Sequence, residues 1–202
     1  MKLYFSPGAC SLSPRISLLE AGLDFSTEKV DTKTKKTESG GDFYAVNAKG
    51  YVPVLQLDNG QYLTEGPAIV QYIADLKPES GLAPKAGTME RTRLQEMLNF
   101  ITTEIHKGFS PLFDATLAPE VKQVFKDKLG KRFDWLSGEL TNKAYVMGEN
   151  FSVADGYLFT VLNWGQWVGV DLAKWPVLQA YHARIAARPK VQEALKAEGL
   201  IK

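Results

Sequence analysis

The chain has 202 residues, of which 45% are hydrophobic and 23% charged, and its formal net charge is +1 at pH 7. This balance is typical of a globular protein with a sizeable core, and it lacks the basic excess of a nucleic-acid-binding protein. The single cysteine excludes an internal disulfide and fits either a reducing compartment or an unpaired reactive thiol, and we expect a cytoplasmic protein. No apolar run is long and uninterrupted enough to predict a signal peptide or a membrane span.

The first strand and the stretch after it hold the most reactive side chain. Residues 2–5 are aromatic and stop at a Pro-Gly pair, which predicts a strand. Pro14 suits the first turn of a helix over residues 14–21, because its missing N–H costs nothing there. We therefore expect Cys10 at or just before a helix N-terminus, a position that favours a thiolate. The alternative is a small buried hydrophobe, as most cysteines outside disulfides are.

A second strand and a hairpin follow. Residues 25–30 predict the strand, and the polar stretch over residues 31–41 leaves room for a short helix at most. Residues 54–57 and 61–63 predict a hairpin, since Asn59-Gly60 suits a positive φ at both central positions of its turn. A proline is tolerated at the start of a strand, and the residues alone leave open whether the Val52–Pro53 bond is cis.

Residues 64–67 open another helix, and the N–H groups at its start suit a carboxylate. Glu65 puts a negative charge there, either to complement the helix dipole or to pair with the ammonium of a zwitterionic ligand. The resulting order, βαβ and then ββα, is a thioredoxin-like layout. Its usual C-x-x-C is replaced by Cys10-Ser11-Leu12-Ser13, so the remaining redox chemistry is a mixed disulfide with a small thiol.

The rest of the chain has helical periodicity. Residues 77–87, with two prolines and two glycines, predict a linker. Ser152 and Asp155 predict a capping box at the start of a buried helix. A polar stripe on the first helix after the linker ends at His106, and a solvent-facing surface is its alternative interpretation. Apolar spacing predicts helices over residues 88–107, 119–140, 152–168, 176–187 and 189–199.

The combined pattern resembles the cytosolic glutathione transferases, specifically the bacterial beta class. The resemblance is carried by residues 6–11, Val52-Pro53, residues 63–66 and residues 151–155, and it covers essentially the whole chain. It implies the glutathione transferase fold: an α/β thioredoxin-like N-terminal domain (βαβ-α-ββα) over residues 1–80 and an all-α C-terminal domain over residues 88–202. It also implies a homodimer.

The implied activity is conjugation of the glutathione thiolate to hydrophobic electrophiles in detoxification. Glutathione would be the co-substrate, and we expect no metal, nucleic acid or membrane partner. Thiol–disulfide exchange through Cys10 is a second implied reaction. The alternative is a non-catalytic protein of the same fold that binds glutathione or hydrophobic ligands.

The resemblance assigns residues to glutathione. Val52 would pair its backbone with the cysteinyl backbone of the ligand, and Pro53 would fix that geometry as a cis proline. Glu65 would take the γ-glutamyl ammonium. Lys35 would meet the glycine carboxylate, and Asn99 and Thr103 would reach the ligand of the partner subunit. The implied glutathione-binding residues are Ala9, Cys10, Lys35, Val52, Pro53, Glu65, Gly66, Asn99, Thr103 and His106.

Three residues are catalytic candidates. Cys10 would face the glutathione sulfur, and His106 would approach it from the helical domain. Which of Cys10, Ser11 and His106 lowers the pKa of the glutathione thiol stays open, because other classes use a hydroxyl near the first strand. The electrophile pocket is expected at Phe5, Phe113, Tyr157 and Trp164. Core packing is the alternative for the last three, and it is favoured for Tyr157.

Overall fold

The computed structural model describes all residues from 1 to 202. The chain divides into two compact units, one formed by residues 1–83 with residues 188–202 and one formed by residues 84–187. The predicted linker over residues 77–87 spans the first change of unit. Residues 188–202 have their contacts in the first unit, whereas the sequence pattern groups them with the helical domain.

The first unit contains a five-stranded mixed sheet of order β3-β2-β1-β4-β5. β1 pairs in parallel with β2, and the other pairs are antiparallel. The predicted thioredoxin-like order is therefore confirmed. β3 was not predicted, because two residues are too few for an alternating pattern. The strands are β1 Lys2–Phe5, β2 Ser26–Asp31, β3 Lys36–Thr37, β4 Val54–Gln56 and β5 Tyr62–Thr64.

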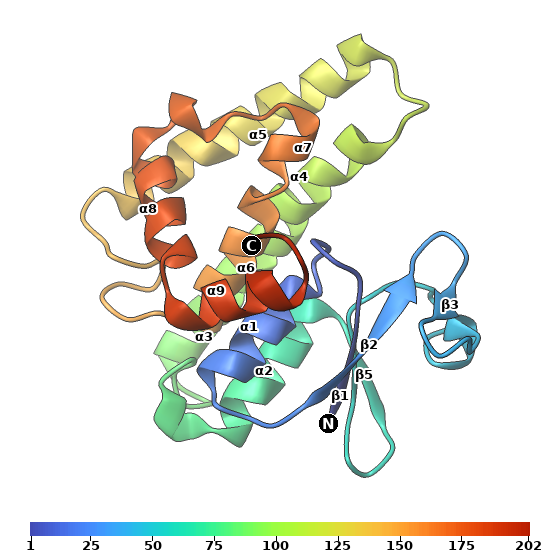
Figure 1. Ribbon diagram of the computed structural model, residues 1–202. Helices are drawn as coiled ribbons and strands as arrows, with labels where there is room; N and C mark the ends of the chain where they lie inside the picture. Colours follow the sequence, from blue (N-terminus) through green and yellow to red (C-terminus); the bar gives the residue numbers. More distant parts are fainter. The chain divides into compact units, whose positions relative to one another are not determined.

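Helices cover one face of this sheet, and Figure 1 shows α1 and α2 beside the strands with α9 next to α1. α1 packs against both α2 and α9. α1 begins two residues before the predicted start, and Pro14 still lies in its first turn. The helices of this unit are α1 Leu12–Glu20, α2 Gly66–Leu76 and α9 Pro189–Ala197, with short 3₁₀ turns η1 Phe43–Ala45 and η2 Pro78–Ser80.

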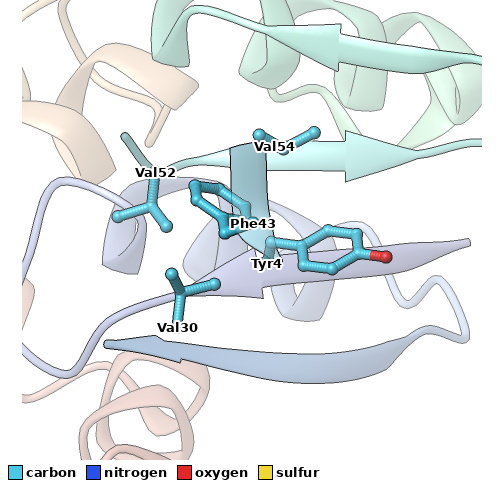
Figure 2. Close-up of a cluster of buried hydrophobic side chains, with 5 residues drawn as sticks. All are labelled: Tyr4, Val30, Phe43, Val52 and Val54. Atoms are coloured by element: carbon cyan, nitrogen blue, oxygen red, sulfur yellow. The ribbon is translucent and has the colours of Figure 1, made fainter. Parts of the chain in front are cut away.

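The other face of the sheet is covered by Phe43 from η1. Side chains alternate between the faces of a strand, and Tyr4, Val30 and Val54 all contribute to this face. Figure 2 shows these side chains with Phe43 and Val52 in one cluster. Val52 is only 5% exposed, although it lies outside the strands. The cluster therefore fixes the backbone just before β4.

The turn between β4 and β5 differs from the prediction at Asn59. Only Gly60 has a positive φ, +82°, because residues 58–60 form a three-residue loop that ends in the left-handed region. The Leu57 N–H donates to the Gln61 carbonyl at 2.8 Å to close this loop. Asn59 uses its side chain instead, since its Oδ1 accepts the N–H of Gln61 at 3.0 Å.

The second unit is helical, as predicted. The helix expected over residues 88–107 changes from α to π geometry at residue 101. No helix of the chain is both long and apolar enough to cross a membrane. Its elements are α3 Met89–Phe100, the π-helix η3 Ile101–His106, α4 Lys107–Phe109, the 3₁₀ turn η4 Ser110–Phe113, α5 Pro119–Leu140, α6 Val153–Leu162, α7 Gly165–Val168, the 3₁₀ turn η5 Leu172–Lys174 and α8 Pro176–Ala186.

The helix expected over residues 152–168 is two helices, α6 and α7. A side chain at Gly165 would collide with the carbonyl of Val170, so the chain folds back closely there. Gly169 ends α7 with φ +68°, a conformation that glycine adopts without strain. The apolar run continues across this break, which is why the sequence did not reveal it.

The predicted capping box at the start of α6 is present. The buried Asp155 carboxylate accepts the N–H of Ser152 at 2.8 Å and the N–H of Val146 at 2.8 Å. The Tyr181 hydroxyl also donates to it, at 2.9 Å. Burial raises the pKa of Asp155, and these hydrogen bonds oppose that rise. The network fixes the first turn of α6.

Candidate functional site

The loop between β1 and α1 is held in place at both ends. The Ser11 hydroxyl accepts the N–H of Ser6 at 3.1 Å and donates to the Ser6 carbonyl at 3.2 Å. Gly8, with φ +72°, donates its N–H to the buried carboxylate of Glu198 at 2.9 Å. This loop ends at Cys10, two residues before α1 begins. The Cys10 side chain therefore stands on a fixed backbone.

Glu198 reaches this loop from the residue that follows α9. Its other oxygen accepts Nε of Arg15 at 2.9 Å, and the Arg15 guanidinium lies 4.3 Å from the centre of the Phe5 ring. Burial raises the pKa of Glu198, while the Gly8 N–H and Arg15 lower it. Phe5, a predicted pocket residue, is thus packed beneath a guanidinium within its own unit.

Ser11 and Ala9 both contribute to the shape of the loop. The Ser11 side chain is fully buried, and both of its hydrogen bonds go to Ser6. Ala9 donates its N–H to the Ser6 carbonyl at 3.1 Å and packs against the cluster that contains Val52. These contacts give Ser11 a structural role in the loop.

The Cys10 thiol meets the backbone of Val52. Its Sγ lies 3.4 Å from the Val52 carbonyl oxygen and donates to it. The Val52–Pro53 peptide bond is cis, which answers the question that the residues alone left open. Cys10, Val52 and Pro53 are therefore neighbours, as the resemblance implies.

Glu65 stands at the N-cap of α2 in an uncommon conformation. Its φ is +69°, and it is one of two non-glycine residues with a positive φ. Such strained residues gather at functional sites. Its Oε1 accepts hydrogen bonds from the Lys49 ammonium and, at 3.3 Å, from the Tyr51 hydroxyl. Gly66 is the first residue of α2, where a backbone N–H favours an anion.

Lys35 is the other non-glycine residue with a positive φ, +58°. Its Nζ donates to the carbonyl of Gly50 at 2.6 Å. Its backbone carbonyl accepts the N–H of Phe43 at 2.8 Å, which ties it to η1 and the core cluster. Both strained residues thus belong to the set that the resemblance assigns to glutathione.

Residues 49–52, hereafter the 49–52 segment, connect the predicted contacts of the first unit. Lys49 and Tyr51 reach Glu65, the Gly50 carbonyl accepts Lys35, and the Val52 carbonyl accepts Cys10. Sequence reasoning missed Lys49, Gly50 and Tyr51 as site residues. The only local signal was Gly50, two residues before Val52. The contacts join residues far apart in the chain, so a local sequence pattern does not reveal them.

In the helical unit, aromatic side chains surround His106. The His106 Nδ1 lies 2.6 Å from the Tyr157 hydroxyl, and its ring centre lies 4.8 Å from that of Trp164. The Trp164 ring is also 5.8 Å from that of Phe113, which is 50% exposed. Three predicted pocket residues therefore cluster with the predicted catalytic histidine. Tyr157 and Trp164 are themselves buried.

Asn99 and Thr103 lie one turn apart where α3 passes into the π-helix η3. The Thr103 hydroxyl donates to the Asn99 carbonyl at 3.1 Å, and both side chains are exposed. His106 ends the π-helix. Wide turns of this kind are frequent at functional sites. No group of three or more histidine, cysteine, aspartate or glutamate side chains in the chain is arranged to hold a metal ion.

Known proteins share this architecture along the whole chain. Residues 8–76 match the family model of the glutathione S-transferase N-terminal domain, and residues 100–189 match that of the C-terminal domain. The glutathione S-transferase GstA of Escherichia coli O157:H7 is 44% identical over 99% of this chain and 100% of its own.

Two solved structures give the same result. A sphingomonad glutathione S-transferase complexed with glutathione has a TM-score of 0.96 and 49% identity, with both chains fully covered. The beta class enzyme of Sphingomonas chungbukensis has a TM-score of 0.96 and 50% identity, again with both chains fully covered. The chain therefore belongs to the glutathione S-transferase family, and these similarities support its assignment to the bacterial beta class.

Proposed function

We propose that glutathione binds along Cys10, Val52, Lys35 and Glu65, and that its thiolate attacks the electrophilic carbon of a hydrophobic substrate. Family membership makes the chain a glutathione S-transferase, and glutathione is its co-substrate. The residues that perform the reaction and the identity of the acceptor belong to the proposal.

The observation that carries the proposal is the 49–52 segment. Its backbone carbonyls accept the thiol of Cys10 and the ammonium of Lys35, and the Lys49 side chain donates to the carboxylate of Glu65. Glutathione has a matching group for each: a central cysteine with a thiol and peptide bonds on both sides, a glycine carboxylate at one end, and an ammonium and a carboxylate at the γ-glutamyl end. Val52 would pair with the peptide backbone, Lys35 with the glycine carboxylate and Glu65 with the ammonium.

The chemical step is displacement at carbon. The thiol of glutathione loses its proton, its sulfur forms a bond to the electrophilic carbon, and a group such as chloride leaves with its electron pair. Donors near the sulfur stabilise the thiolate, and Cys10 is the candidate that has a thiol to donate. His106, oriented through Nδ1 by Tyr157, is our candidate for the proton acceptor from the helical domain.

Cys10 supports a second reaction, thiol–disulfide exchange. Its thiolate would attack oxidised glutathione, form a mixed disulfide, and release one molecule of glutathione thiolate. A second glutathione thiolate would reverse this exchange. When the disulfide attacked joins glutathione to another thiol, the first step releases that thiol, and the second frees Cys10 and forms oxidised glutathione, so the substrate disulfide is reduced. The position of Cys10 just before α1 favours the thiolate that this reaction needs.

We further propose a homodimer that works in cytoplasmic detoxification. Asn99 and Thr103 are exposed on one stretch of helix, and they would contact the glutathione of the partner subunit. Phe113, Tyr157 and Trp164 would contribute the apolar surface for the electrophile.

Mass spectrometry tests the Cys10 role. Purified protein incubated with oxidised glutathione is expected to gain the mass of one disulfide-linked glutathione, which dithiothreitol removes and Cys10→Ala abolishes. Conjugation of glutathione to a chlorinated nitrobenzene tests the activity in the same preparation. Glutathione binding without either reaction would favour the non-catalytic alternative. An unmodified mass after incubation with oxidised glutathione would count against a mixed disulfide at Cys10.

A further inference from the structure

Lys49 and Tyr51 both contact the carboxylate of Glu65. The Lys49 ammonium donates to Oε1 of Glu65 and, at 3.0 Å, to the hydroxyl oxygen of Thr64. The Tyr51 hydroxyl donates to the same Oε1 at 3.3 Å. The Lys49 ammonium also lies 5.6 Å from the centre of the Tyr51 ring, within the range of a cation–π contact. The three side chains thus hold one another in a single arrangement.

We propose that Lys49 and Tyr51 are positioning residues for glutathione, which hold the Glu65 carboxylate ready for the γ-glutamyl ammonium. This inference rests on the proposed function, because it takes Glu65 as the partner of that ammonium. Neither residue belongs to the set that the sequence pattern assigned to glutathione.

Glu65 needs such support because its side chain is 57% exposed. A glutamate in solvent samples many rotamers, and binding a ligand would have to restrict them. Two donors on Oε1 restrict the carboxylate before the ligand arrives. The positive φ of Glu65 fixes its backbone at the start of α2, so the donors act on the remaining freedom of the side chain.

A carboxylate that accepts a hydrogen bond from Lys49 can still bind a second cation. A carboxylate has two oxygens and about four acceptor positions, so it can accept a lysine and a ligand ammonium together. The hydrogen bond that Lys49 donates to Glu65 raises the pKa of Lys49, which keeps this lysine charged.

The contact does little for the stability of the fold. The Lys49 side chain is 43% exposed, and ion pairs this exposed contribute little to folding free energy. The effect of removing Lys49 is therefore expected in ligand binding. Lys77 provides a matched control, because it is 42% exposed and pairs with Glu79 at 3.4 Å, just after the other end of α2.

The test is steady-state kinetics of the full chain with glutathione and a chlorinated nitrobenzene. Lys49→Met is expected to raise the KM for glutathione by about 3- to 10-fold, with kcat within about twofold. Tyr51→Phe is expected to raise it by about twofold. Lys49→Arg should restore the wild-type KM, and Lys77→Met should leave it unchanged. None of these variants should shift the thermal unfolding temperature.

Two further readouts separate positioning from general attraction. With a glutathione analogue that lacks the γ-glutamyl amino group, Lys49→Met should have little effect, since the analogue has no ammonium for Glu65. In a Glu65→Gln background, Lys49→Met should add no further rise in KM. An equal loss with both ligands would overturn the inference.

The remaining outcomes distinguish failure of this inference from failure of the proposed function. A KM for glutathione that is the same in Lys49→Met and Lys77→Met sinks the inference, and a lower KM in Lys49→Met would mean that Lys49 competes with the ligand. If the wild-type chain neither binds nor uses glutathione, the proposed function itself fails. If the wild type uses glutathione normally but Lys49→Met behaves like Lys77→Met, the proposed function stands and only the role of Lys49 and Tyr51 is lost.

Discussion

The sulfur of Cys10 lies 3.4 Å from the backbone carbonyl oxygen of Val52. This contact ties the reactive thiol to the backbone that is proposed to pair with glutathione. A thiol in this place is a donor to a neighbouring group, and after losing its proton it is a nucleophile. The two roles belong to two different reactions, and they can be separated by substitution.

Cys10→Ala is expected to abolish glutathione-dependent disulfide reduction and to keep conjugation within about tenfold of wild type. The reductase reaction needs a sulfur atom to form the mixed disulfide, whereas conjugation uses the sulfur of glutathione itself. Both rates are measured on the same preparation, with glutathione binding checked by calorimetry. Loss of both activities with binding intact would make Cys10 the catalyst of conjugation.

Gly50→Ala is expected to destabilise the fold by about 1–2 kcal/mol and to weaken glutathione binding. Gly50 has φ +69°, and a Cβ there would lie 2.6 Å from Cε1 of Tyr44. Moving the backbone would shift the carbonyl that accepts Lys35. Urea unfolding and calorimetry measure the two effects.

Gly22→Ala is the matched control for Gly50. Its φ is +65°, and a Cβ there would have no neighbour within 4 Å. It carries the same backbone strain without the collision. If both variants lose the same stability and bind glutathione equally well, the contact with Tyr44 has no importance for the site.

Tyr157→Phe is expected to lower kcat and to leave the KM for glutathione near wild type. The Tyr157 hydroxyl lies 2.6 Å from His106 Nδ1, and without it the imidazole loses the partner that sets its orientation. Tyr181→Phe is the control, because it removes a buried hydroxyl from the same helical unit. That variant should lose about 1–3 kcal/mol of stability with kcat unchanged. An unchanged kcat in Tyr157→Phe would remove His106 from the proposed chemistry.

The stability of the wild-type chain is expected to fall as the pH drops below the ordinary histidine range, in part through His182. Burial lowers the pKa of His182 from the ordinary value of 6.5. Below that pH the unfolded chain takes up a proton that the folded chain does not, so acid favours unfolding. The stability is fully present above the unfolded pKa and is lost as the pH falls toward the folded pKa.

Thermal unfolding at about pH 7.5 and about pH 5.5 tests this dependence. His182→Gln should make the decrease between the two values smaller, because glutamine does not titrate. The neutral imidazole lies 2.8 Å from the Asn163 side-chain oxygen and stacks at 4.8 Å on Phe159, so the variant should also be less stable at both values. An equal decrease in wild type and variant would show that other groups cause the acid sensitivity.

The elements with local signals were predicted well. The Pro-Gly pair after β1, Ser152 with Asp155, and Pro67 at the start of α2 each mark an element end through chemistry that neighbouring residues complete. The helices of the second unit follow from apolar spacing. Their irregularities do not, since the π-helix at residues 101–106 and the break at Gly165 leave the spacing of apolar residues intact.

Site residues that belong to a family motif could be predicted from the sequence. Residues that the fold alone brings to the site could not. Cys10, Val52 and Glu65 belong to short motifs. Lys49 and Tyr51 lie in no motif, and they reach Glu65 only because the chain folds residues 49–52 back to the start of α2. The burial of Ser11 and its two hydrogen bonds to Ser6 likewise depend on how the chain packs.

The return of residues 188–202 to the first unit has a consequence for the order of assembly during synthesis. The ribosome makes all of residues 84–187 before Glu198, so the helical unit is complete in the nascent chain while the first unit still lacks a part. Until Glu198 emerges, the Gly8 N–H and Nε of Arg15 lack the carboxylate that binds them. Domains fold as units when their residues are available. We therefore expect the loop that carries Cys10 to be among the last parts of the protein to become ordered.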